Sequence, residues 1–186
     1  MKYPKFERFV TGALLSALLA CARQETPAAE IPSRAAITAG TMASDFTARD
    51  IDGKTVTLSE HLSKEVVLLN FCASWCEPCV AEFPHLRRIY EANRARGLFV
   101  MAISMDGPES AANVPGFARR NQLNFPMLID DDSRISSLYN KKKAAPLTIL
   151  IDKTRKIVLV REGYNAGDEI LLVREIEKAL GAPPQP

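Results

Sequence analysis

The residues best suited to chemistry lie together in the segment Trp75-Cys76-Glu77-Pro78-Cys79. Two cysteines separated by two residues can form a redox disulfide, although zinc sites use the same spacing. The sequence holds no second Cys-x-x-Cys pair that would complete a metal site. The pair also follows residues 65–71, an apolar run typical of a strand buried on both faces. The motif therefore stands where a strand passes into a helix, which favours redox chemistry and predicts no bound metal.

The start of a helix is a favourable place for a reactive thiol. Unpaired N–H groups and the helix dipole stabilise an anion there, so Cys76 can be a thiolate near neutral pH. Cys79 lies one turn later and can attack a mixed disulfide formed on Cys76. Pro78 fits the first helical turn. The negative charge of Glu77 should raise the thiol pKa and favour a reducing protein, although the helix dipole acts in the opposite direction.

The remaining sequence predicts strands and helices that alternate around this motif. Asp52-Gly53 predicts a hairpin turn between two short strands. The expected strands are 65–71, 98–104, 127–129, 147–152 and 156–161. Four helices are expected: one after Cys76, one over about 109–121, a short one with Ser133 as its N-cap, and one that begins near residue 168. We expect the last helix to pack through Leu172, Val173, Ile176 and Leu180. This order predicts a three-layer α/β fold with a mixed sheet.

The segment NFCASWCEPCVAEFP resembles the active site of the thioredoxin superfamily, and most closely its ResA/TlpA branch of membrane-tethered thiol reductases. Pro84 stands where thioredoxins carry a kinking proline, and Ala145-Pro146-Leu147-Thr148 matches their cis-proline segment. The resemblance covers residues 45–180, with an additional helix–strand unit between about 106 and 130. It implies a thioredoxin-like α/β/α fold with an N-terminal hairpin, and no cofactor. It also implies a cis Ala145–Pro146 bond facing the cysteines, where the Ala145 backbone pairs with an extended substrate.

Two further residues near the pair are candidates for the site. Trp75 is expected to shield the cysteines and to offer a flat apolar contact to substrates, with a core tryptophan as the alternative. Thioredoxins place a buried aspartate beneath the pair, but the corresponding residue here is Asn70, which cannot titrate. ResA-like proteins carry a glutamate close to the cysteines at the position of Glu82. Glu82 is therefore expected to relay protons or modulate the thiol pKa, unless it lies on a solvated helix face.

Cys72 departs from the resemblance, because the family usually has a bulky residue there. We interpret it as a buried core thiol, and an alternative follows from Cys72-x-x-x-Cys76, the spacing of Sco-like copper chaperones. The Sco-like pattern also needs a histidine late in the chain, and neither His61 nor His85 lies there. Both are expected to be structural or exposed. A peroxiredoxin-like antioxidant is a further alternative, suggested by the inserted unit and FPMLIDDD. Peroxiredoxins use Thr/Ser-x-x-Cys, whereas Ser74 is only two residues before Cys76.

The first residues predict export. Residues 10–20 are apolar and follow a basic segment with Lys2, Lys5 and Arg8, as in a secretory signal. Leu18-Leu19-Ala20-Cys21 resembles the lipobox of bacterial lipoproteins, so Cys21 is expected to carry a lipid anchor. Ordinary cleavage at Ala20-Cys21-Ala22 and an uncleaved helix are the alternatives. We therefore predict a signal over 1–21, a flexible tether over 22–43 and the thioredoxin-like domain over 44–182.

Composition limits the choice of partners. The 186 residues are 47% apolar and 25% charged, as in globular domains, and a net charge of +2 gives no indication of a nucleic-acid partner. The export signal implies that the domain faces the periplasm or extracytoplasmic space, and the resemblance implies that it acts on disulfides of exported proteins. Apocytochrome c is the leading candidate substrate, and a membrane thiol donor of CcdA or DsbD type would return electrons.

Overall fold

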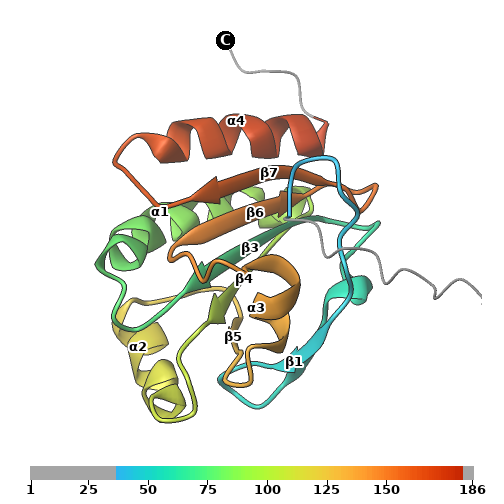
Figure 1. Ribbon diagram of the computed structural model, residues 1–186. Coiled ribbons are helices and arrows are strands. Elements are labelled where there is room, and N and C mark those ends of the chain that lie inside the picture. Colours follow the sequence, from blue (N-terminus) through green and yellow to red (C-terminus); the bar gives the residue numbers. More distant parts are fainter. Residues whose placement is uncertain (1–36, 182–186) are drawn as a thin grey trace, which may run out of the picture. The chain divides into compact units, whose positions relative to one another are not determined.

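A mixed five-stranded sheet forms the centre of the computed structural model, which describes residues 37–181 (Figure 1). The strand order is β5-β4-β3-β6-β7, and β3, β4 and β5 are parallel while β6 and β7 are antiparallel to their neighbours. The bounds are β3 Val66–Cys72, β4 Leu98–Ser104, β5 Met127–Ile129, β6 Leu147–Ile151 and β7 Ile157–Glu162. These bounds confirm the predicted strands to within one or two residues.

The central strand β3 is buried along its whole length. Because successive side chains of a strand point to opposite faces, β3 contributes to two separate cores. Val66, Leu68 and Cys72 pack on one face, and Val67, Leu69 and Phe71 pack on the other. Because both faces of β3 are buried, nearly all of its residues must be apolar, which confirms the prediction of a strand buried on both faces.

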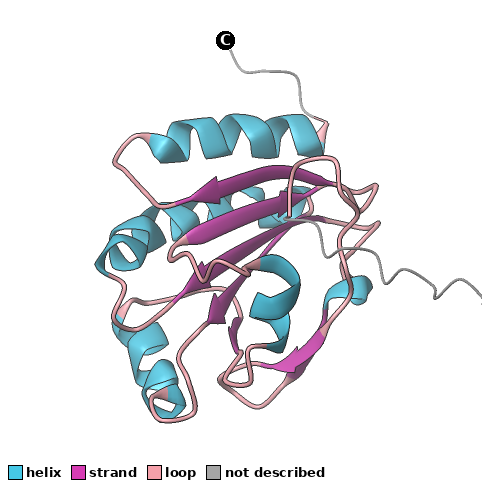
Figure 2. Cartoon of the chain, viewed as in Figure 1, coloured by secondary structure: helices cyan, strands magenta, loops and turns pink. Residues whose placement is uncertain are grey.

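Helices cover both faces of the sheet (Figure 2). Residues of α1 Glu77–Asn93, α2 Val114–Arg120 and α4 Asp168–Leu180 belong to the core on one face. The opposite core includes residues of α3 Arg134–Tyr139 and of the hairpin formed by β1 Thr47–Arg49 and β2 Thr55–Thr57. The predicted three-layer fold with an N-terminal hairpin is confirmed, and its topology carries the end of β3 directly into α1.

Two local predictions differ from the structure. The helix expected over 109–121 begins only at Val114, after a 3-10 turn over 111–113. Pro115 is tolerated in the first turn of a helix but would clash inside a longer one. The predicted N-cap position of Ser133 in α3 is confirmed, but its side chain makes no capping bond. Asp130 instead accepts the backbone N–H groups of Ile135 and Ser136 at 2.8 and 2.7 Å. Val173 is exposed, whereas Leu172 and Ile176 are buried.

The folded domain begins earlier than residue 44. The Gly40 N–H donates to the carbonyl of Ile157 at 2.7 Å, and that of Ala43 donates to Arg155 at 2.9 Å. Met42 forms a β-bridge with Lys156, and Ala43 is buried. The last residues assigned to the tether are therefore an extended segment paired with the chain at the start of β7. The predicted signal and Cys21 lie outside the described residues, and residues 37–181 contain no helix able to span a membrane.

Candidate active site

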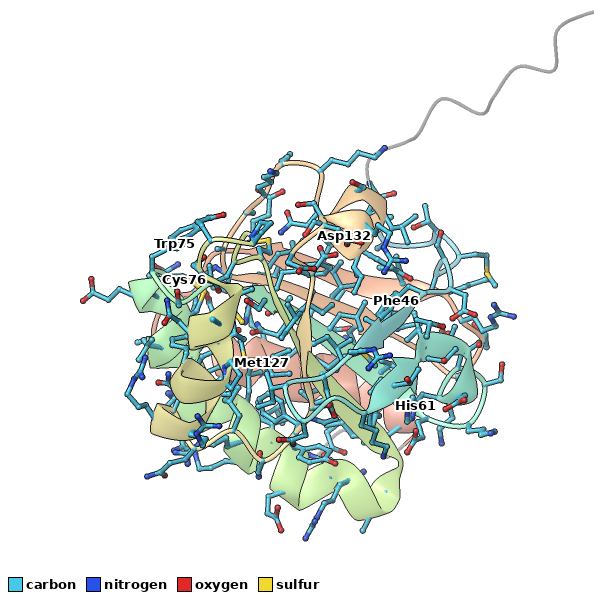
Figure 3. All side chains as sticks on the ribbon, turned by 90° about the horizontal axis from the view of Figure 1, so that it is seen from below. Phe46, His61, Trp75, Cys76, Met127 and Asp132 are labelled. Carbon is cyan, nitrogen blue, oxygen red and sulfur yellow. A yellow bond between two sulfur atoms is a disulfide. The ribbon has the colours of Figure 1, made fainter. Side chains whose placement is uncertain are left out.

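A disulfide joins Cys76 and Cys79 at the beginning of α1, with their Cα atoms 5.3 Å apart (Figure 3). Cys76 is the N-cap residue, and its sulfur accepts the backbone N–H of Cys79 at 3.2 Å. The same N–H would stabilise a thiolate on Cys76 after reduction. Cys76 is 3% exposed and Cys79 is fully buried. Cys76 is therefore the more accessible residue of the pair to an external disulfide.

Trp75 is the most exposed large apolar side chain of the described residues, at 70%. In Figure 3 it lies beside Cys76 at the periphery of the molecule. Val80, on the first turn of α1, is also exposed. The alternative of a core tryptophan is therefore wrong, and an apolar surface adjoins the disulfide.

The Ala145–Pro146 peptide bond is cis, as the resemblance implied. It directly precedes β6, and the carbonyl of Pro146 accepts the backbone N–H of Gly163 at 2.8 Å. Ala145 packs against the apolar cluster that contains both cysteines. The segment thus lies on the same side of the sheet as the disulfide.

Glu82 is buried one turn beyond Cys79, with 1% of its surface exposed. The alternative of a solvated helix face is therefore wrong. Its carboxylate accepts hydrogen bonds from Asn70 Nδ2 at 2.9 Å, Thr148 Oγ1 at 3.1 Å and Arg161 Nη2 at 2.6 Å. Burial raises the pKa of Glu82, and the positive charge of Arg161 and the three hydrogen bonds oppose that rise.

Strand register explains why these three donors meet. Thr148 on β6 lies opposite Asn70 on β3 and opposite Arg161 on β7. Side chains of directly paired residues project from the same face of a sheet, so the row faces α1 and Glu82. Sequence reasoning considered Asn70 but missed Thr148 and Arg161, because no local pattern connects residues 66 or more positions apart.

A second buried carboxylate holds the loop that precedes Cys76. Asp106 is 1% exposed and accepts the backbone N–H of Ser74 at 3.0 Å and the hydroxyl of Ser104 at 2.7 Å. It also accepts the hydroxyl of Ser74. Sequence reasoning missed Asp106, which reaches the loop because Ser104 and Cys72 are paired at the ends of parallel strands. These bonds fix the backbone just before Trp75 and Cys76.

Cys72 is fully buried in the cluster that contains the disulfide, as the interpretation of a core thiol requires. Burial and the charges of Asp106 and Glu82 raise the pKa of Cys72, which keeps it a neutral thiol. His61 stacks on Phe99 and lies far from Cys76 in Figure 3. Among residues 37–181 no group of three or more His, Cys, Asp or Glu side chains could hold a metal ion. Cys76, the second thiol that the copper-chaperone alternative requires, is bonded to Cys79.

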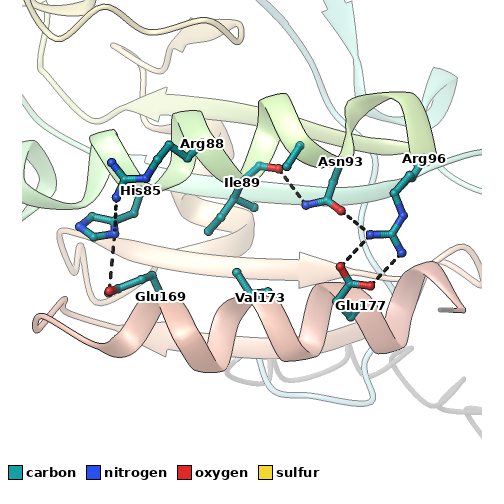
Figure 4. A pocket seen from close by; sticks show the side chains of 9 residues that line it. His85, Arg88, Ile89, Asn93, Arg96, Glu169, Val173 and Glu177 are labelled. Atoms are coloured by element: carbon teal, nitrogen blue, oxygen red, sulfur yellow. Dashed lines mark hydrogen bonds and ion pairs between the residues drawn. The ribbon is translucent and has the colours of Figure 1, made fainter. Parts of the chain in front are cut away.

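A groove of about 550 Å³ separates α1 from α4 (Figure 4). His85 and Glu169 lie at one end, and Arg96 binds Glu177 through two contacts of 2.7 and 2.8 Å at the other. Neither Cys76 nor Cys79 lines this groove. The disulfide therefore belongs to a separate part of the surface.

Comparisons with known proteins agree with this geometry. The chain matches the AhpC/TSA family over residues 39–160. It is 30% identical over 167 residues to "Thiol-disulfide oxidoreductase ResA" of Geobacillus thermodenitrificans, covering 89% of this chain and 94% of that protein. The Bacillus subtilis protein of the same name is 34% identical, with coverage of 82% and 83%.

Solved structures support the same assignment. A Chlorobium tepidum protein provisionally named thiol:disulfide interchange protein DsbE is 30% identical, with a TM-score of 0.72 over 78% of this chain and all of that one. A Bacteroides thetaiotaomicron protein provisionally named as a disulfide isomerase is 32% identical, with a TM-score of 0.71, covering 78% and 91%. With its disulfide at the start of α1, the chain belongs to the AhpC/TSA family, within the thioredoxin superfamily, and to its ResA-like thiol–disulfide oxidoreductases.

Proposed function

We propose that this protein reduces disulfides of exported proteins, with Cys76 as nucleophile and Cys79 as resolving thiol. The observation that carries the proposal is the position of Cys76, whose sulfur caps α1 and which is the more exposed residue of the pair. The Cys76 thiolate attacks one substrate sulfur, and the other substrate sulfur leaves as a thiolate. The Cys79 sulfur then attacks Cys76 and releases the second substrate thiol. The substrate gains two electrons, and Cys76–Cys79 becomes a disulfide.

Proton transfer is the step that Glu82 is proposed to perform. Cys79 is fully buried, so water has no direct access to its thiol. Glu82 lies three residues later on the same helix, where residues three apart are neighbours. Its carboxylate accepts the proton of Cys79 as that sulfur attacks the mixed disulfide.

Substrate binding is proposed to use the surface around the disulfide. The exposed ring of Trp75 offers an apolar contact, and the backbone of Ala145, before Pro146, pairs with an extended segment of the substrate. Exported proteins such as apocytochrome c, whose haem-site cysteines must be reduced, are the proposed substrates. A membrane dithiol of CcdA or DsbD type is the proposed source of electrons.

The reduction potential tests the direction of this reaction. We expect the full chain, equilibrated against glutathione or dithiothreitol, to have a potential near that of thioredoxin, roughly −270 mV. The negative charge of Glu77 beside the pair opposes formation of the thiolate and so favours the disulfide. A value near roughly −120 mV, as in the oxidant DsbA, would contradict the reductase and its substrates.

The AhpC/TSA match also bears on the peroxiredoxin-like alternative. Reduction of hydrogen peroxide coupled to dithiothreitol would detect that activity. The position of Ser74, bound to Asp106 and only two residues before Cys76, argues for disulfide exchange instead.

We also propose that the domain is held at the outer side of a bacterial membrane by a lipid on Cys21, after the signal is cleaved between Ala20 and Cys21. Cys21→Ser should abolish incorporation of labelled fatty acid and leave unprocessed precursor, because the thioether cannot form. Labelling and gel mobility measured in cells check this prediction, with Cys72→Ser as the matched control. Equal labelling of Cys21→Ser and wild type would contradict the anchor.

A further inference from the structure

An ion pair between a partly buried guanidinium and a buried carboxylate lies beside the cysteine-bearing helix. Arg161 Nη2 is 2.6 Å from Glu82 Oε1, and the two side chains are 16% and 1% exposed. Arg161 lies on β7 and Glu82 on α1, so the pair joins the last strand of the sheet to the helix that carries the cysteines. Sequence motifs gave no role to Arg161.

The guanidinium is oriented by contacts on both of its sides. Its Nη1 donates to the carbonyl of Asp168, the first residue of α4, at 2.8 Å. Thr148, its partner on β6, binds the same carboxylate oxygen of Glu82 as Arg161 does. A side chain held in this way presents its charge to Glu82 in one fixed geometry.

The other groups near Glu82 cannot replace this charge. Asn70 from β3 and Thr148 from β6 are neutral hydrogen-bond donors. Cys72 from β3 and Tyr164 from the segment before α4 are both acids whose pKa is raised by burial and by acidic neighbours that include Glu82, so they remain neutral near neutral pH. Asp106 adds negative charge in the vicinity of Cys72. Arg161 therefore supplies the positive charge that favours an ionised Glu82.

We propose that Arg161 is a positioning residue that sets the charge state of Glu82. A carboxylate accepts the proton of Cys79, whereas a protonated carboxyl group cannot. The inference rests on the proposed relay for its consequence in catalysis, but the ion pair can be measured without any substrate. Burial without a cation drives a carboxyl group toward its neutral form, so the loss of Arg161 should protonate Glu82 over a wider range of pH.

The test follows the 13C signal of the Glu82 carboxyl group through a pH titration of the full-length, oxidised protein. In Arg161→Met the titration midpoint should move to higher pH than in the wild type, and Arg161→Lys should return it toward the wild-type value. Arg96→Met is the matched control, because Arg96 binds Glu177 at the far end of α1 (Figure 4). It should leave the Glu82 midpoint unchanged. Should Arg161→Met fail to fold, Arg161→Gln removes the charge and keeps a hydrogen-bond donor.

An unchanged midpoint in the neutral variants would overturn the proposal. A second measurement separates this result from a failure of the proposed relay: the rate at which a mixed disulfide on Cys76 is resolved at neutral pH. With the relay, Arg161→Met should slow resolution by about tenfold or more, and Glu82→Gln should be equally slow with or without Arg161. A shifted midpoint with unchanged resolution would support the control of Glu82 by Arg161 and contradict the relay alone.

Discussion

Cys79→Ser should stop turnover and leave the substrate attached to Cys76. The nucleophile remains in this variant, but no second sulfur is available to attack the mixed disulfide. Cys76→Ser should form no adduct at all, because Cys79 is fully buried. We expect disulfide reduction by either variant to fall on the order of 10³-fold or more, since the two thiols act as a unit.

Non-reducing gels and mass spectrometry of each variant, incubated with a disulfide-bonded protein, check this prediction. Cys72→Ser is the matched control, because Cys72 is equally buried but makes no disulfide. It should keep its activity. Adducts on Cys76→Ser, or full turnover by Cys79→Ser, would contradict the proposed order of attack.

Glu82→Ala should strongly destabilise the oxidised protein. The substitution leaves the guanidinium of Arg161 without its buried partner and removes the acceptor of Asn70 and Thr148. Breaking a buried ion pair in this way costs about 3–5 kcal/mol of the free energy of unfolding. Urea unfolding measures the difference.

Glu177→Ala is the control for that measurement, because it removes the partner of the more exposed Arg96. It should cost no more than about 1 kcal/mol. An equal loss of unfolding free energy in the two variants would show that the ion pair of Glu82 and Arg161 contributes no more to stability than the more exposed pair.

The pH dependence of stability gives an independent check on Glu82. Its pKa is raised in the folded protein, chiefly by burial, so between the unfolded and folded pKa values the folded state binds more protons. The free energy of unfolding should therefore fall as pH rises from the ordinary carboxyl range through the raised pKa. Glu82→Gln cannot titrate and should lack this slope. Parallel pH profiles for the wild type and Glu82→Gln would contradict the raised pKa.

The sequence alone determined the redox pair and the strand and helix between which it lies. Cysteine spacing, an apolar strand before the motif and helical periodicity after it are local patterns, so they predicted the end of β3, the start of α1 and the place of Cys76. A local preference also explains one difference: Pro115 is tolerated only in the first turn of a helix, so α2 begins at Val114.

Tertiary structure decided how the pair is surrounded. Whether Glu82 faces water or the core depends on which strands lie beneath α1, and one strand row brings Asn70, Thr148 and Arg161 to it. Asp106 reaches Ser74 only because β4 lies beside β3. Desolvation and charge at these residues follow from contacts between distant segments, and the periodicity of a single segment contains no information about its partners.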